Sequence, residues 1–584
     1  MAVDLKTGYK LHKAGDLTGA EAVYRDLVKS KTFSPYLFQN LGAILRQKEK
    51  PQEAIDIYNH GLEIYPNDPG ILANRANILR ADKPVTALYD LLAAIKADPQ
   101  NINAWITAVS ILRDIDSPGS AYNLAREAVP KCGANPKVLV MILASLGDLE
   151  LLNDEPLAST IAEILSLIES RISALKPAEQ AETYFSLAYL MTQATHSREG
   201  LRFYQKGLQT LTGSEPQGQA DRQDRDKLFI QNAWNIACAL LKNQQLEEGW
   251  KLYDYGLGVP AKGQQEWQRA LKKPFSGDQL PLWRGEPLSG KRLLLLEEQG
   301  IGDTMMFLTL LPALNQEAEQ VDIILADRLY PIYQRSLVEV YPNIRLWHQR
   351  DAVLEKISSS SYDYQCPLGS ICRYRFTKPE DYAQKSPILI ANEAKTKALR
   401  SSYQERYPGA KLIGVSWSGG GSPERIRKKS PPRDLFDALL TQPLDNIVFV
   451  SLQYGDVRKV CESWQSRGAA LIHDESIDPL IDMEAWLNQV AACDAVISAA
   501  NTTIHGAGGL GIPTMCLLSK DSDWRWFDDP SVQRSYWYPS VGILRESLQE
   551  GWSPALRQTR QWLREGCGMP TGPAYTSPSQ VDKI

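Results

Sequence analysis

An acidic residue on a glycine-rich turn is the first feature of this sequence that could do chemistry. The stretch Lys291–Leu311 reads KRLLLLEEQGIGDTMMFLTLL, in which an apolar run leads to a turn that ends at Gly302, and Asp303 follows directly. An acid at such a turn could take a proton as a general base, or it could cap the helix that follows. Chemistry alone leaves both interpretations open. Glu297 and Glu298 are less favoured, because a glutamate at the end of a strand is often only solvated.

A capped helix start forms a second candidate site. Asn501 precedes Thr502, Thr503 and His505, and an asparagine at this position is a natural N-cap that leaves free amides in the next turn. Such amides attract an anion, for which the phosphate of a nucleotide is the obvious candidate. The alternative is a capped core helix with a buried His505. The glycines that follow favour the functional interpretation, since they weaken a helix unless something must approach closely.

A third candidate is a glycine turn that leads into a basic run. Ser418, Gly419 and Gly420 are followed by bases that include Arg425 and Lys428. Such a run could bind a diphosphate through charge-assisted hydrogen bonds, although a run of charges is more often a solvated loop. No Gly-Lys-Ser/Thr follows the glycines, which disfavours an ATPase of the P-loop type.

Two further features bear on ligand binding. Gln453 closes a predicted strand, where its amide could hydrogen-bond a nucleotide's base or ribose. The letters Asp521-Ser522-Asp523 match a DxD motif that binds metal in some enzymes, but three letters are weak evidence, and we interpret them as a loop that positions Trp524 and Trp526. No His/Cys cluster has zinc spacing. We therefore predict no bound metal.

The elements that must position these residues alternate between strand and helix from about residue 280 to the end. Two openings from a strand into a glycine turn, at Arg292 and Leu412, predict two Rossmann-like domains, residues 280–405 and 406–584, that face one another across a cleft. A polar helix around Asn392–Arg406 marks the boundary, and a last helix, Pro554–Glu565, could pack back onto the first domain. The predicted strands are Arg292–Glu297, Val321–Ala326, Ile344–Trp347, Leu412–Trp417, Ile447–Leu452, Ala470–His473, Ala495–Ser498 and Thr514–Leu518.

Residues 1–258 carry an internal repeat. Small residues such as Gly8 and Gly42 recur at about 34 residues, and Tyr24 and Tyr58 recur at the same interval in the second helix of each unit. This pattern resembles tetratricopeptide repeats, and it decays after Val138. The polar run of residues 212–227 predicts a loop. We expect the repeats to form a groove for a protein partner; the alternative is a scaffold or a dimer interface. A chain without residues 1–258 is expected to remain folded and to bind nucleotide.

The charge, the apolar runs and the cysteines of the sequence exclude several classes of protein. The 584 residues carry a formal net charge of −5, which argues against a general nucleic-acid binder. No apolar run is long enough for a membrane span, and the first residues lack a signal-peptide core. Eight cysteines form no CxxC pair, which favours buried thiols in a reducing compartment. These features predict a cytoplasmic protein.

The second half is similar to bacterial proteins that fuse tetratricopeptide repeats to a glycosyltransferase of the heptosyltransferase type. The matching segments are PLWRGEPLSGK from Pro281, EQGIGD ending at Asp303, SLQ from Ser451, DAVIS from Asp494, TTIH from Thr502, GGLGIP from Gly508, DWRW from Asp523 and WYP from Trp537. The resemblance implies a GT-B fold and a metal-independent glycosyltransferase that uses a nucleotide-sugar donor and no cofactor.

In that family the position of Asp303 is the proposed base, and related proteins modify flagellin or other surface proteins. The matching positions imply a donor site at Gly302, Ser418, Gly419, Gly420, Arg425, Lys428, Gln453, Asn501, Thr502, Thr503 and His505. One departure is Asn501, where the family usually has an aspartate. It keeps open a second hypothesis, a non-catalytic repeat adaptor with a degenerate GT-B binding module. A third hypothesis is a glycan acceptor, with the repeats serving to form a homo-oligomer.

Overall fold

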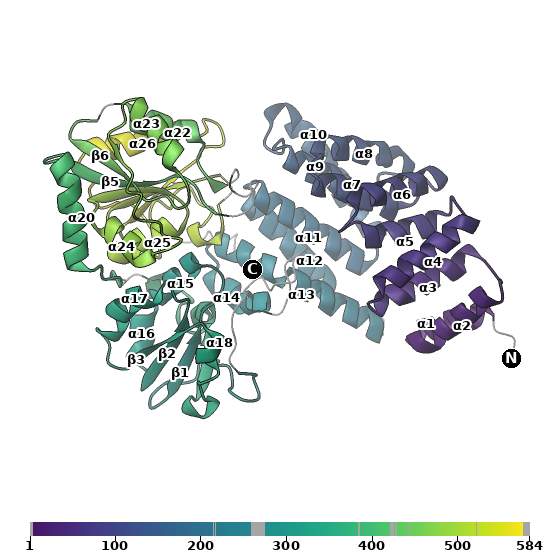
Figure 1. Cartoon of the computed structure of the whole chain (residues 1–584). Helices are drawn as coiled ribbons and strands as arrows, with labels where there is room; N and C mark the ends of the chain where they lie inside the picture. Colours follow the sequence, from purple (N-terminus) through teal and green to yellow (C-terminus); the bar gives the residue numbers. More distant parts are fainter. Residues whose placement is uncertain are drawn as a thin grey trace. The chain divides into compact units, whose positions relative to one another are not determined.

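The computed structural model describes residues 4–213, 215, 216, 218–257, 275–382, 386–420, 426, 429–442, 444–520 and 522–575 (Figure 1). The chain divides into two compact units. One unit comprises Met1–Ala194 and Lys206–Glu215, and the other comprises Thr195–Gln205 and Pro216–Ile584. No helix in the described part of the chain is long and apolar enough to cross a membrane.

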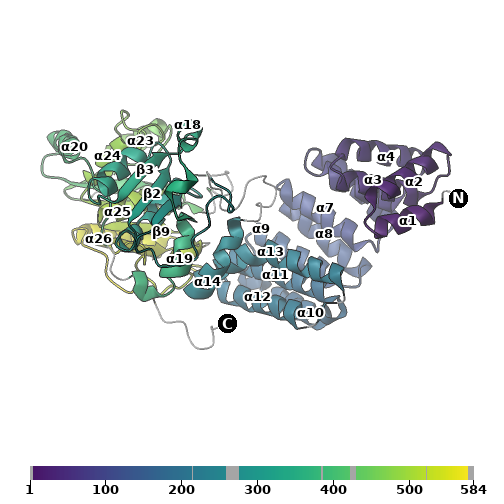
Figure 2. The same ribbon diagram turned by 90° about the horizontal axis from the view of Figure 1, so that it is seen from below.

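The first unit is an array of helix pairs, which Figures 1 and 2 show stacked in sequence order. Several helices start at a proline whose fixed φ suits the first helical position, after a residue such as Ser34 or Asp68 whose side chain caps the helix. The helices are α1 (Leu5–Lys13), α2 (Leu17–Lys29), α3 (Pro35–Gln47), α4 (Pro51–Ile64), α5 (Pro69–Leu79), α6 (Pro84–Ala97), α7 (Ile102–Asp114), α8 (Pro118–Lys131), α9 (Pro136–Asp148), α10 (Ala158–Arg171) and α11 (Pro177–Gln193).

The small residues of the repeat lie where the paired helices cross. A Cβ added to Gly8 would come within 2.5 Å of the Tyr24 ring, and the Tyr58 ring covers Gly42 in the same way. Both tyrosines are fully buried. A side chain at either glycine would therefore force the helices apart. The structure confirms a tetratricopeptide-like helical repeat, and α9 continues it at the expected interval even though its sequence pattern is weak.

The last helices differ from the sequence-based expectation. They are α12 (Ser197–Thr212), α13 (Gln219–Lys242) and α14 (Leu246–Tyr253). The polar run of residues 212–227 was predicted to be a loop, but most of it is the first two turns of α13. Exposed polar residues are compatible with a helix when only its later turns are buried.

Helices α13 and α14 belong to the second compact unit. Trp250 and Tyr253 of α14 are fully buried in the core of the α/β region. The Trp250 ring lies 5.5 Å from that of Trp524 and 6.4 Å from that of Phe307. Deleting residues 1–258 would remove part of this core, which argues against the expectation that the α/β part folds without them.

A four-stranded parallel sheet begins the α/β region, with strand order β3-β2-β1-β4. Leu293–Leu296 are all fully buried, as expected for a parallel strand covered on both faces. Arg292 of β1 pairs with Gln320 of β2, and Leu293 pairs with Tyr364 of β4. The elements are β1 (Arg292–Leu296), α15 (Ile301–Leu308), α16 (Leu311–Asn315), β2 (Gln320–Leu325), α17 (Tyr330–Tyr333), β3 (Ile344–His348), α18 (Asp351–Leu354), β4 (Tyr364–Pro367) and α19 (Ile371–Arg375).

A six-stranded parallel sheet follows, with strand order β10-β9-β8-β5-β6-β7. This is the order 3-2-1-4-5-6 of a doubly wound fold, in which the strand order reverses between β5 and β8. The elements are α20 (Glu393–Arg406), β5 (Lys411–Ser416), α22 (Arg433–Thr441), β6 (Ile447–Ser451), α23 (Arg458–Ser466), β7 (Leu471–Ile472), α24 (Met483–Ala491), β8 (Ala495–Ala499), α25 (Thr502–Leu510), β9 (Thr514–Leu518), β10 (Val541–Arg545) and α26 (Ser553–Arg564).

Two helices pack differently from the prediction. The predicted bounds put helix α20 at the end of the first domain, but it packs against α24, where Gln489 donates to the Tyr403 hydroxyl at 2.9 Å. Arg400 also pairs at 2.7 Å with Asp494, which follows α24. The connection between the sheets therefore precedes α20. Helix α26 packs against α22 and β10 of the second sheet, because its apolar residues Ala555, Trp562 and Leu563 join that core. The suggestion that it packs onto the first domain is wrong.

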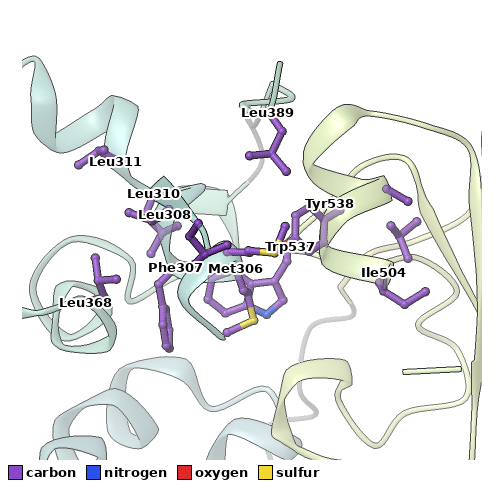
Figure 3. Close-up of a cluster of buried hydrophobic side chains, with 14 of the residues drawn as sticks. Met306, Phe307, Leu308, Leu310, Leu311, Leu368, Leu389, Ile504, Trp537 and Tyr538 are labelled. Carbon is purple, nitrogen blue, oxygen red and sulfur yellow. The ribbon is translucent and has the colours of Figure 1, made fainter. Parts of the chain in front are cut away.

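An apolar cluster joins the two sheets and α14. Figure 3 shows Met306 and Phe307 of α15 beside Trp537 and Tyr538 from the segment after β9, with Ile504 of α25 nearby. All five side chains are buried. The cluster holds the start of α15 against the start of α25, which brings two of the sequence-predicted sites together.

Candidate active site at the carboxyl edges of the sheets

Helix α15 carries Asp303 at the carboxyl end of β1. The helix begins at Ile301, and its N-cap is Gly300. The Asp303 carboxylate accepts a hydrogen bond of 3.1 Å from the backbone N–H of Gly300. Asp303 is thus in the first turn rather than at the N-cap, and its other oxygen is directed elsewhere.

That oxygen meets an arginine from the second sheet. Arg525, in the 3₁₀ turn Trp524–Trp526 after β9, donates from Nε to Asp303 Oδ1 at 2.7 Å, and its Nη2 bonds the same oxygen. The guanidinium also lies 4.3 Å from the centre of the Trp524 ring, a cation–π distance. The two sheets are therefore joined at their carboxyl edges by a largely buried ion pair, with side chains 15% and 16% exposed.

A second acid and a second base complete this cluster. Asp523 accepts from Arg525 Nη1 at 3.0 Å, and Lys429 Nζ lies 3.5 Å from the same carboxylate. Gln299, on the turn before α15, accepts from Arg525 Nη2 at 3.3 Å and donates to the Tyr253 hydroxyl of α14. We call Asp303, Asp523, Arg525 and Lys429 the charge cluster.

The charges of the cluster stabilise one another against burial. Burial pushes the pKa of Arg525 down, but the carboxylates of Asp303 and Asp523 outweigh it and raise this pKa above its usual value. Burial likewise pushes the pKa of Asp523 up, and Arg525 and Lys429 outweigh it and hold the pKa below its usual range. Both residues are therefore charged at neutral pH.

His505 lies beside the charge cluster but is not part of it. A Cβ on Gly302 would come 2.8 Å from His505 Cδ2, so α15 and α25 approach closely enough here to require a glycine. His505 Nδ1 and the Tyr538 hydroxyl share a hydrogen bond of 3.0 Å. Burial lowers the pKa of His505 to about 4, so the imidazole is neutral at pH 7. It adds no positive charge for an anion.

Asn501 caps α25 as predicted, and its amide also ties together two strands. Its Oδ1 accepts from the N–H of Thr503 at 2.8 Å. Its Nδ2 donates to Ser416 Oγ at 2.8 Å and to the carbonyl of Ser418 at 3.0 Å. These bonds cross the point between β5 and β8 where the strand order reverses, which is where doubly wound folds place their ligands.

Gln453 makes similar internal contacts. Its Oε1 accepts from Ser416 Oγ at 3.0 Å and from the N–H groups of Trp417 and Ser418, each at 2.9 Å. Its Nε2 donates to the carbonyl of Ser418 at 3.1 Å. Gln453 thus shapes the turn after β5.

The remaining predicted residues have varied surroundings. Gly419 donates to Ser430 Oγ at 3.2 Å, and Gly420 is exposed beside Tyr454. Thr502 is the half-buried first residue of α25, and Thr503 is buried. Arg425 and Lys428 lie outside the described residues.

The two glutamates at the end of β1 are committed to the fold. Glu297 accepts from Thr304 Oγ1 at 3.1 Å and from the N–H of Ala326, and Glu298 accepts from the N–H of Gly369. Both are buried, and burial raises the pKa of Glu297. Neither lies in the charge cluster.

Sequence reasoning assigned no role to Arg525, and it interpreted residues 521–523 as a loop that positions Trp524 and Trp526. The available signal for Arg525 was the alternation of acid and base directly after a predicted buried strand. In the structure both tryptophans are buried, and Asp523 pairs with Arg525 and Lys429. Among the described residues, no group of three or more His, Cys, Asp or Glu side chains is arranged to hold a metal ion.

Comparison with known proteins gives one relative over most of the chain. No family model matches the sequence. Protein FlbA of Caulobacter vibrioides is 24% identical over 545 residues, which cover 90% of this chain and 83% of FlbA. The similarity thus extends over the helical repeats and the α/β region alike.

Solved structures resemble only part of the chain. The crystal structure of MamA covers 30% of this chain and 99% of its own, at 14% identity and a TM-score of 0.27. Pseudomonas aeruginosa pilF covers 38% of this chain and 94% of its own, at 15% identity and a TM-score of 0.28. These TM-scores are too low to establish a shared fold.

Proposed function

We propose that this protein is a glycosyltransferase of the GT-B type, which transfers a sugar from a nucleotide-activated donor to a protein. The observation that carries the proposal is the meeting of two parallel sheets at their carboxyl edges, with Asp303 from one and Arg525 and Lys429 from the other. Ligands of doubly wound sheets bind beyond these edges. The reaction needs a base for the acceptor and positive charge for the leaving diphosphate, and the charge cluster contains both.

In the proposed reaction an acceptor hydroxyl attacks the anomeric carbon of the donor sugar. The new bond forms from the acceptor oxygen, the bond from that carbon to the diphosphate oxygen breaks, and the nucleoside diphosphate leaves with the electron pair. Asp303 takes the hydroxyl proton. Arg525 and Lys429 stabilise the charge that develops on the leaving diphosphate, and the first-turn amides of α25 lie at the same edge.

The helical repeats supply the protein specificity in this proposal. Stacked helix pairs form extended surfaces that bind other proteins, and the repeat geometry of α1–α9 is regular. The acceptor class, flagellin or another surface protein, follows from the resemblance of the motifs.

A non-catalytic adaptor is the second candidate, and one observation favours it. Asp303 is paired with Arg525, and the side-chain amides of Asn501 and Gln453 form hydrogen bonds within the protein. A site in which every polar group is satisfied internally can be a scaffold. The two candidates differ in whether the Asp303 carboxylate becomes available when a donor binds.

The experiment is donor turnover by the purified full-length chain with a panel of nucleotide sugars, compared with Asp303→Asn. An amide accepts the hydrogen bond from Gly300 but takes no proton, so sugar release or transfer should fall by roughly 10²- to 10⁴-fold while the fold is kept. Asp327→Asn is the matched control, since Asp327 is also paired with an arginine, Arg350, on the first sheet. Turnover by Asp303→Asn at the wild-type rate would remove Asp303 from the mechanism. No turnover with any donor, together with nucleotide binding, would favour the adaptor.

A further inference from the structure

The Arg525 guanidinium pairs with two carboxylates, one from its own turn and one from the other sheet. Asp523 lies two residues away in the same turn, whereas Asp303 lies on α15 of the other sheet. The contact with Asp523 is local and would persist in any arrangement of the sheets. The contact with Asp303 depends on how closely the two carboxyl edges approach. Asp303 is therefore the partner that another anion could replace.

A phosphate group can accept the same hydrogen bonds from Arg525 that the Asp303 carboxylate accepts. Guanidinium groups bind carboxylates and phosphates with the same forked geometry. Trp524 packs against one face of the guanidinium, and Lys429 lies 3.5 Å from the Asp523 oxygen that Arg525 also contacts, where it adds a second positive charge. The Asp303 carboxylate occupies Nε and Nη2 of Arg525, so a phosphate can take the same position only if Asp303 moves away.

We propose that Arg525 binds the diphosphate of the donor, and that Asp303 occupies Arg525 only until the donor arrives. This inference rests on the proposed function and extends it to a residue that the motif resemblance left without a role. Donor binding then does two things in one exchange of ion pairs. It places a cation on the leaving group, and it releases the Asp303 carboxylate to accept the proton of the acceptor.

This exchange of ion pairs predicts an effect on nucleotide affinity that a site without a competing carboxylate would not show. If Asp303 competes with the diphosphate for Arg525, removing the charge of Asp303 should strengthen nucleotide binding although it abolishes transfer. Removing Arg525 should weaken binding. In a chain that already lacks Arg525, the Asp303 change should have much less effect, because the two variants act through one contact.

The test is calorimetric titration of UDP, GDP, CDP and ADP into the full-length chain and its variants. For the nucleotide that binds, we expect Asp303→Asn to tighten binding roughly tenfold and Arg525→Gln to weaken it roughly tenfold or more. Adding Asp303→Asn to Arg525→Gln should change affinity by less than about threefold. Asp327→Asn, which removes one carboxylate from an arginine pair elsewhere on the first sheet, should leave affinity unchanged and so controls for net charge.

Several outcomes would overturn the inference. Unchanged or weaker binding by Asp303→Asn would show that Asp303 does not compete. Equal tightening in the presence and absence of Arg525 would show that Asp303 repels the nucleotide directly. If Arg525→Gln is poorly folded, Arg525→Lys is the alternative, because it keeps the positive charge but lacks the two parallel N–H donors of a guanidinium. Wild-type affinity in Arg525→Lys would also count against the inference. Turnover without this binding pattern would leave the proposed function standing and remove only the role of Arg525, whereas no binding of any nucleotide would remove both.

Discussion

At the carboxyl edge of each sheet, a strand leads through a turn into a helix whose start carries a polar residue. The two polar residues make different kinds of contact. At the first edge, β1, a glycine turn and α15 present Asp303 to a segment of the other sheet. At the second edge, β8 and α25 present Asn501, whose amide bonds only to neighbouring strand ends and to its own helix. A contact made across two sheets can be exchanged for a ligand, whereas contacts within one sheet hold the fold. The following predictions test this difference, starting with the largest expected effect.

Both carboxyl edges depend on α14, which packs against α15 and against the segment after β9. Deleting residues 1–258 removes Trp250 and Tyr253, which are fully buried against Phe307 and Trp524. Losing two such side chains costs roughly 6 kcal/mol or more, which is comparable to the whole stability of a domain. We expect this truncated chain to lose cooperative unfolding, measured by circular dichroism. A chain that lacks only residues 1–194 retains α14 and is the control; if both truncations unfold alike, α14 is not the reason.

The contact between the two edges should make stability depend on pH through His505. The folded pKa is about 4 and the reference value is 6.5, so the unfolded chain takes up the proton first as the pH falls. The stability from neutral His505 is fully present above pH 6.5 and is lost towards pH 4, by about 3 kcal/mol. Denaturant titration at several pH values measures it. His505→Gln should lack this component, and an identical pH dependence in that variant would contradict the prediction.

Breaking the internal contacts of the second edge should affect stability more than changing Asp303 does. Gln453→Leu removes the hydrogen bonds to Ser416, Trp417 and Ser418 and leaves buried donors without a partner, at a cost of about 2–3 kcal/mol. Asp303→Asn should cost less than this, because the amide still accepts from Gly300 and Asp523 still pairs with Arg525. Urea denaturation of both variants gives the comparison, and the reverse order would mean that the Asp303–Arg525 pair holds the fold.

Glycines at the two edges should also respond differently. Gly302→Ala places a methyl group 2.8 Å from the buried His505 ring, whereas a Cβ on Gly419 meets nothing within 4 Å. We expect the first change to destabilise the protein by on the order of 1 kcal/mol, and the second to have almost no effect. Thermal unfolding of both variants is the measurement. Equal melting temperatures would show that α15 and α25 are further apart than described.

Much of the fold could be predicted because parallel strands leave a strong local signal. The runs at Leu293–Leu296 and Ile447–Ser451 are buried on both faces, so they must be apolar throughout, and their positions were predicted to within a residue or two. Strand β4 was missed because it has only four residues and ends at Pro367, and β10 was missed because Gly542 interrupts its apolar run. The period of the helical repeats could also be predicted from the sequence, because each pair of helices needs a small residue where the two helices cross.

The sequence by itself determined where chemistry could lie: an acid after a glycine turn at Asp303 and a helix cap at Asn501, because each depends on neighbours only a few residues away. The tertiary structure alone decided what these residues do. Asp303 meets Arg525 across 222 residues of sequence, Gln453 turns inward to the loop after β5, and α14 joins the core of the α/β region. Such contacts follow from how two sheets and a helix pack together. No local pattern encodes which distant charge a carboxylate will meet when its surroundings are buried.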